Sequence, residues 1–221
     1  MPMKSVCLLS RLPGTTPQAF RDYYENNHSR LGSRYFPFLK YVRNHVVSAS
    51  PAVNFDVITE FFFAPDVDVA GVHSGRVREI LDADERRFMD QRLIRPAGAE
   101  EALLAGPPRG VEAPGRRRLM LLLNPITGAG GEFAASVAAW GQGLAADSSV
   151  LRVTLDQTMR QVPGGDNAFP YQALLSLWLE SDQLPTPGAP PAGIELASTL
   201  LTEVCESPPE LLRELYQPDA G

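Results

Sequence analysis

Three histidines, His28, His45 and His73, are the only histidines of the 221-residue chain, and all of them lie in its first third. Histidine has an ordinary pKa near neutral pH, so it is the usual side chain for moving protons in catalysis. Carboxylates that could fix its tautomer, Asp56 and Glu60, follow in the same part of the chain. The first half therefore carries the groups for acid–base chemistry, whereas His73, within GVHSGRV, is predicted to lie in a surface loop.

The stretch TTPQAFRDYYENNHSRLG predicts a helix over residues 16–31, with a threonine and a proline at its start and Gly32 at its end. Phe20, Tyr24 and His28 recur every four residues, followed by Leu31, so the four share one face. Because three of them are apolar, this face should pack against a sheet. His28 should then point inward, while the charged residues of the helix face solvent.

An inward histidine needs hydrogen-bond partners, and two later strands offer them. Asn44 and His45 are adjacent, so strand alternation allows only one of them to face His28. Asp56 and Glu60 share a face of the next strand with Ile58 and Phe62. These residues support two interpretations equally: a core histidine that is bonded to an acid, and a catalytic histidine that is oriented by one.

Hydrophobic and glycine/proline patterns predict that the chain consists of two similar halves. Residues 1–105 form the first, 106–116 a Pro/Gly linker, 117–206 the second and 207–221 a tail with one helical turn. The first half has the order β-α-β-β-α-β of a ferredoxin-like α+β fold. The second half is predicted to repeat this order, with strands near 118–124, 149–162 and 171–181, a helix near 131–145, and a helix or strand at 194–205.

Composition narrows the location and the partners. The net charge of -6 argues against nucleic acid or an anionic membrane as a partner. No signal peptide and no apolar run of roughly 18 residues is found, which predicts a cytoplasmic protein. The two cysteines are interpreted as core residues rather than as a disulfide.

Aromatic residues are unevenly divided between the halves. Eight of ten phenylalanines and four of six tyrosines lie in the first half, and the second half has no histidine. A residue with a purely structural role would more readily be kept in both copies. The first half is therefore predicted to hold an aromatic-lined pocket, with the second half as its support.

Four segments together resemble the EthD family: RLPGTTPQAFRDYYENNH, YVRNHVV, FDVITEFFF and DADERRF, within a region from Lys4 to Leu104. The resemblance implies a dimeric α+β barrel, built here from two ferredoxin-like repeats in one chain, with a degenerate second copy and a pocket between a sheet and its helices. It also implies cofactor-independent cyclases, dehydratases or decarboxylases of polyketide-like or aromatic oxo substrates. His28 matches the helix histidine of the family.

The resulting hypothesis is a lyase or cyclase in which His28 is the general acid/base. Asp56 is the expected carboxylate partner, and His45 a second catalytic candidate. The substrate-binding candidates are Tyr24, Asn44, Glu60, Phe62, Asp84 and Phe88. Asp84, in the acidic DADE run, could equally begin a surface helix. A homodimer of such barrels is a further expectation.

Other functions fit the sequence less well. A cofactor-independent monooxygenase and a non-catalytic small-molecule-binding protein remain alternatives within the same fold. No metal, flavin or nucleotide is expected, because no dinucleotide fingerprint is present and His28, His45, Asp56 and Glu60 lack close ligand spacing. The loops LLLNPITGAGG and PGGDNAF resemble phosphate-binding loops of lipid kinases, but turn glycines explain both.

Overall fold

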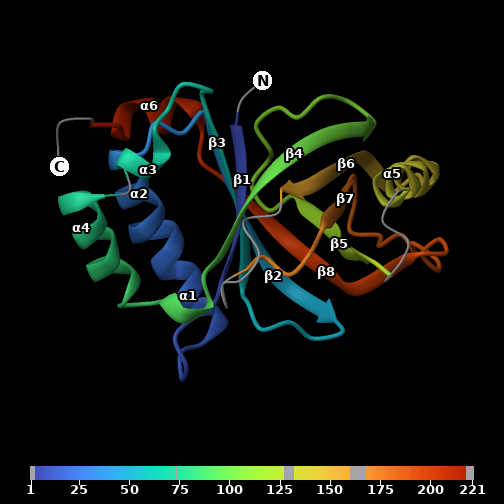
Figure 1. Cartoon of the computed structure of the whole chain (residues 1–221), viewed down its shortest axis with the longest axis horizontal. Helices are drawn as coiled ribbons and strands as arrows, with labels where there is room; N and C mark the ends of the chain where they lie inside the picture. Colours follow the sequence, from blue (N-terminus) through green and yellow to red (C-terminus); the bar gives the residue numbers. More distant parts are fainter. Residues whose placement is uncertain (1–2, 73, 127–131, 160–167, 218–221) are drawn as a thin grey trace.

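The structure, a computed structural model, describes residues 3–72, 74–126, 132–159 and 168–217. Eight antiparallel strands close into a barrel in the order β1-β3-β2-β8-β5-β7-β6-β4 (Figure 1). The strands are β1 (Met3–Leu9), β2 (Lys40–Ser50), β3 (Val57–Phe63), β4 (Arg95–Ala105), β5 (Arg117–Pro125), β6 (Val150–Met159), β7 (Ala173–Leu179) and β8 (Ile194–Glu206). His73, the glycines of LLLNPITGAGG, the end of the predicted strand at 149–162 and most of the predicted PGGDNAF turn lie outside the described residues.

Both halves of the chain contribute four strands to this one barrel. The first half orders them β4-β1-β3-β2 and the second β8-β5-β7-β6. The pairs β2–β8 and β4–β6 join the halves, so each half closes the edges of the other. The prediction of one barrel within a single chain is confirmed.

The second half differs from its predicted order. Its described residues contain one helix before the tail, α5 (Phe133–Leu144), which packs on the outer face of β5, β6 and β7. Residues 180–193, which join β7 to β8, contain no helix, in keeping with their prolines. The ambiguous segment at 194–205 is a strand.

The helices of the first half lie together on one side of the barrel, and α5 lies on the other (Figure 1). They are α1 (Pro17–Tyr23), the π-helical turn η1 (Tyr24–His28), α2 (Ser29–Tyr35), α3 (Val69–Val72), α4 (Gly75–Glu85) and the 3-10 turn η2 (Gln91–Leu93). The tail forms α6 (Pro209–Leu215). Its Leu212 packs into the apolar cluster between the first-half helices and the sheet, which also contains Phe20 and Tyr24. No helix in the described part of the chain has the length and hydropathy to cross a membrane.

The helix that carries His28 begins as predicted and ends later. Thr16 caps it through a hydrogen bond from the Ala19 amide, and Pro17 occupies the first turn. Instead of ending at Gly32, the helix continues to Tyr35. In η1 the amide of Ser29 donates to the carbonyl of Tyr24, five residues back, which widens the helix at the residues that face the sheet.

The barrel interior is apolar at one end and charged at the other. At the charged end the Lys4 ammonium lies 2.9 Å from Glu60 and 2.6 Å from both Glu101 and Asp156. The linker has no helix or strand, as predicted, but it inserts the Arg109 side chain into this end, over the ring of Trp178. The linker is thus part of the core.

Candidate active site

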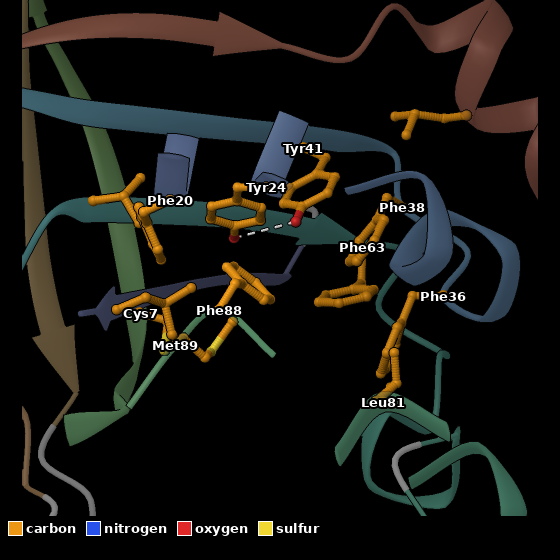
Figure 2. Close-up of a cluster of buried hydrophobic side chains, with 13 residues drawn as sticks. Cys7, Phe20, Tyr24, Phe36, Phe38, Tyr41, Phe63, Leu81, Phe88 and Met89 are labelled. Carbon is orange, nitrogen blue, oxygen red and sulfur yellow. Dashed lines mark hydrogen bonds between the residues drawn. The ribbon is translucent and has the colours of Figure 1, made fainter. Parts of the chain in front are cut away.

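A cavity of about 260 Å³ lies between the outer face of β1, β3 and β2 and the helices of the first half. Its walls are mostly apolar and aromatic, and Figure 2 shows the Phe36, Phe38 and Phe63 rings near Tyr41, with Leu81 reaching in from α4. The lining side chains with polar groups include His28, Tyr24, Tyr41, Arg78 and Glu85. Cys7 also lines the cavity, and burial raises the pKa of its thiol to about 12, which keeps it protonated.

His28 lies in the cavity wall and is paired with a carboxylate. Its Nδ1 is 2.8 Å from Oδ2 of Asp84, and the Tyr23 hydroxyl donates to Oδ1 of Asp84 at 2.7 Å. Burial alone would raise the pKa of Asp84, but the hydrogen bonds from His28 and Tyr23 outweigh it and hold the pKa below its ordinary value. An ionised Asp84 accepts the Nδ1 proton, so Nε2 is the nitrogen left to exchange protons with a ligand.

The prediction that Asp56 orients His28 is wrong. Asp56 accepts a hydrogen bond of 2.8 Å from the backbone amide of Arg11 and forms an ion pair with its guanidinium. It precedes β3 and borders a separate surface hollow with the loop at residues 10–15. Asp84, named among the substrate-binding candidates, takes the place expected for Asp56.

Three other candidates lie on the wrong face of the sheet. Asn44, Glu60 and Phe62 point into the barrel, because alternation along β2 and β3 turns them away from the helices. Glu60 is bound there by Lys4, Arg109 and Arg118. These cations hold the pKa of Glu60 well below its usual range, although burial alone would raise it.

His45, rather than Asn44, faces the helices, but it does not line the cavity. Its Nε2 is 2.6 Å from Oε1 of Glu25, which also accepts a 2.6 Å hydrogen bond from Arg43 at its other oxygen. Sequence spacing placed Glu25 on the solvent face. The π-helical turn instead brings it to the sheet, where 21 % of its side chain remains exposed.

Tyr24 and Phe88 lie beside His28 as expected, with different roles. Tyr24 lines the cavity, accepts a 3.2 Å hydrogen bond from the Tyr41 hydroxyl and shares one of 2.8 Å with Thr59 (Figure 2). Phe88 does not line the cavity. Its ring lies 5.0 Å from that of His28 and supports the imidazole from behind.

Sequence reasoning missed most of the cavity wall. Alternation along β3 could have identified Phe61 and Phe63, because they share the helix-facing side with Thr59. Residues from the loops and the second helical region, such as Met89 and Ile94, carry no comparable signal. The missed lining residues include Phe36, Phe38, Tyr41, Phe61, Phe63, Val69, Leu81, Met89 and Ile94.

Two side-chain groups in the described part of the chain have metal-ligand chemistry, and protein cations already bind both. Glu60, Glu101 and Asp156 surround the Lys4 ammonium. Glu25 and Cys205, which lie with His45, accept hydrogen bonds from Arg43 and Arg21. Neither donor set is arranged to favour an added cation.

The fold and the cavity together define an α+β barrel in which one half of the sheet and its helices enclose a site. Residues 12–92 match the sequence model of the EthD domain, so this part of the chain is similar to that family. The match covers the helix, both strands and the DADE segment that position His28 and Asp84. The second half lies outside it.

Solved structures share the architecture over nearly the whole chain. An anthrone oxidase-like protein superposes with a TM-score of 0.61 at 10% identity, covering 93% of this chain and 92% of its own. Two proteins called putative monooxygenases, from Fusobacterium nucleatum and Lactobacillus acidophilus, give TM-scores of 0.55 and 0.51 at 9% and 10% identity. They cover 93% and 91% of this chain, and 94% and 93% of their own. No curated protein matches the chain in sequence.

Exchanging Asp84 for asparagine is expected to lower any turnover that depends on His28 on the order of 10²-fold. An amide can still contact Nδ1, but it no longer fixes one tautomer or stabilises the imidazolium. Asp56→Asn is the matched control, since Asp56 binds Arg11. Steady-state rates of both variants test this, and equal losses would contradict the assignment of Asp84.

Glu25 is expected to make stability depend on acid pH. Burial alone would raise its pKa, but His45 and Arg43 lower it from 4.5 to about 2. The ionised side chain therefore stabilises the fold fully above pH 4.5, and this contribution is lost as pH falls from 4.5 towards 2. The size of this contribution is about 3 kcal/mol. Urea unfolding at pH 7, 4.5 and 3 measures this. The free energy of unfolding should be higher for wild type than for Glu25→Gln at pH 7, and this difference should become smaller as the pH falls.

Proposed function

We propose that the protein is an enzyme that removes a proton from an aromatic or polyketide-like oxo compound, with His28 as the general base. The observation that carries this proposal is the His28–Asp84 pair in the wall of an otherwise apolar, aromatic cavity. An oriented imidazole beside a pocket of this kind suits a neutral, largely apolar substrate. The cavity volume of about 260 Å³ suits a small or planar one.

The reaction would begin at Nε2 of His28, which takes a proton from a carbon next to a carbonyl. Asp84 would stabilise the imidazolium that forms. Tyr24 lines the cavity and accepts a hydrogen bond from Tyr41, so with Thr59 as a second donor its own hydroxyl proton would be left to bind the enolate oxygen. The enolate carbon would attack an internal carbonyl, and His28 would return the proton to the alkoxide that forms. His28 would then take a second proton from the same carbon and pass it to the departing hydroxide, which completes an aldol cyclisation with loss of water without any cofactor.

A cofactor-independent monooxygenase would use the same first step. The enolate would then react with dioxygen instead of an internal carbonyl. The names of the three similar structures, monooxygenase and anthrone oxidase-like, favour keeping this alternative. A protein that only binds such a compound is the third candidate, because aromatic walls serve capture as well as catalysis.

Anthrone, an aromatic ketone with an acidic carbon, is a suitable probe. In deuterated buffer without oxygen, the wild type should exchange the C10 protons of anthrone faster than His28→Gln does, as followed by proton NMR. In air, accelerated anthraquinone formation would support the oxygenase. Binding without exchange would support the binding protein, and exchange at the rate of His28→Gln would refute His28 as the base.

We also infer that the second half is a degenerate ferredoxin-like copy that serves as scaffold. The strand orders of the two halves correspond position by position, and α5 covers its sheet where α1 covers the first. The apolar cluster between α5 and the sheet, to which the helix contributes Phe133 and Val137, contains no histidine. A homodimer of whole barrels stays a prediction.

A further inference from the structure

The helix that carries His28 is bound to the sheet through charged groups rather than through apolar packing alone. Directly beneath it, β2 presents Arg43 and His45, and the neighbouring β8 presents Glu203 and Cys205. Ser207 follows directly after β8. We call these five residues the ionic platform; three of them come from the second half of the chain and the start of its tail.

Two residues of the helix bind the platform. Glu25, in the π-helical turn, accepts a hydrogen bond of 2.6 Å from Arg43 and lies 2.6 Å from His45. Arg21, one turn earlier, pairs with Glu203 and lies 3.6 Å from Sγ of Cys205. The helix is thus tied to both halves of the barrel at consecutive turns.

The platform is internally braced, so it can serve as a fixed reference. Arg43 donates to the Ser207 hydroxyl at 2.7 Å and to the Tyr41 carbonyl at 3.0 Å, and its guanidinium lies over the Tyr41 ring. Its side chain is only 5 % exposed. Burial and these contacts leave Arg43 little freedom to follow a moving helix.

The position of Glu25 within the turn links the platform to His28. Both residues belong to the same five-residue π-helical turn, and Tyr24 beside Glu25 has its ring 5.2 Å from that of His28. A turn of this type is less stable than an α-helical turn and needs contacts that hold it. A return to α-helical geometry would rotate His28 relative to Asp84, which lies on the separate helix α4.

From these contacts we infer that Glu25 and Glu203 are positioning residues: through the ionic platform they hold the π-helical turn so that His28 meets Asp84 at the cavity. The inference rests on the proposed role of His28, and it assigns the second half a part in building the site. It also gives a reason for the ion pairs beneath this helix, because apolar contacts alone could hold the helix on the sheet.

The first test is spectroscopic and needs no substrate. Nitrogen-15 spectra of histidine side chains report the tautomer, and His28→Gln identifies the His28 signals. Wild type should show the Nδ1–H tautomer of His28, whereas Glu25→Gln should show a mixture of tautomers. Glu203→Gln, which removes a partly exposed partner, should give a smaller change in the same direction and covers the case in which Glu25→Gln does not fold.

The second test uses the anthrone exchange assay. Glu25→Gln should lower kcat on the order of 10²-fold with KM nearly unchanged, because misplacing a base affects the transition state more than binding. Glu25→Asp should recover part of the loss. Asp22→Asn is the matched control, because this exposed carboxylate on α1 contacts only Gln18 in the described part of the chain.

The two tests separate the possible failures. If wild type exchanges no anthrone but the His28 tautomer shifts in Glu25→Gln, the proposed function fails and the positioning role stands. If folded Glu25→Gln and Glu203→Gln both keep the wild-type tautomer and rate, the ionic platform only stabilises the fold and the inference is overturned.

Discussion

His28→Gln is expected to lower turnover by roughly 10²- to 10⁴-fold, the usual worth of a positioned proton-transfer group. Glutamine can still donate to Asp84, so the hydrogen bond survives while the ability to take up and return a proton is lost. The His28 side chain is 11 % exposed, and glutamine is close to histidine in size, so the packing around it changes little. The variant should therefore fold and bind ligand.

Thermal unfolding and a binding titration with anthrone complete this measurement. A His28→Gln protein with the wild-type rate would make the histidine a ligand-positioning or structural group. His28→Ala that fails to fold would instead favour the core-histidine interpretation. Loss of rate with intact folding and binding is the result that the proposed function requires.

Glu60→Gln is expected to lower the free energy of unfolding by about 3 to 5 kcal/mol, the cost of removing one partner from a buried ion pair. Lys4, Arg109 and Arg118 all contact this carboxylate inside the barrel, and its side chain is 1 % exposed. Turnover per folded molecule should not change, because Glu60 points away from the cavity. Urea unfolding and rates at equal folded concentration measure both.

Glu100→Gln is the matched control for this charge change. Glu100 is exposed on β4, next to Glu101 of the buried cluster, so its replacement should alter the unfolding free energy by about 0.5 kcal/mol or less. If Glu60→Gln were as stable as wild type but had lost its turnover, Glu60 would belong to the active site after all.

The sequence predicted the helix face of His28 and the two strands beneath it because local periodicity sets both. It could not predict the carboxylate partner. Asp84 follows His28 by 56 residues and meets it only through the way α4 packs. Asp56 was nearer along the chain and on a recognised strand, but its side chain lies at the end of that strand, beside Arg11.

Face assignment failed where two sheets of one barrel share an interior. Asn44 lies on β2, and Glu60 and Phe62 lie on β3. Both faces of these strands carry polar and aromatic side chains, so the alternation of residues does not show which face meets the helices. Glu25 was misplaced for a different reason: helical spacing assumes a regular turn, and η1 inserts a wider one. Hydrophobic periodicity reveals neither which strand face meets the helices nor where a π-helical turn interrupts a helix.

Closure of the barrel within one chain has an evolutionary consequence. In a barrel made by two identical subunits, one gene specifies both pockets, and each substitution enters both sides of the interface at once. Here the β2–β8 and β4–β6 pairs join halves that are encoded separately, so selection can act on them independently. One half can keep His28 and its aromatic wall while the other drifts, provided that its last strand still presents Glu203 to the helix of the first.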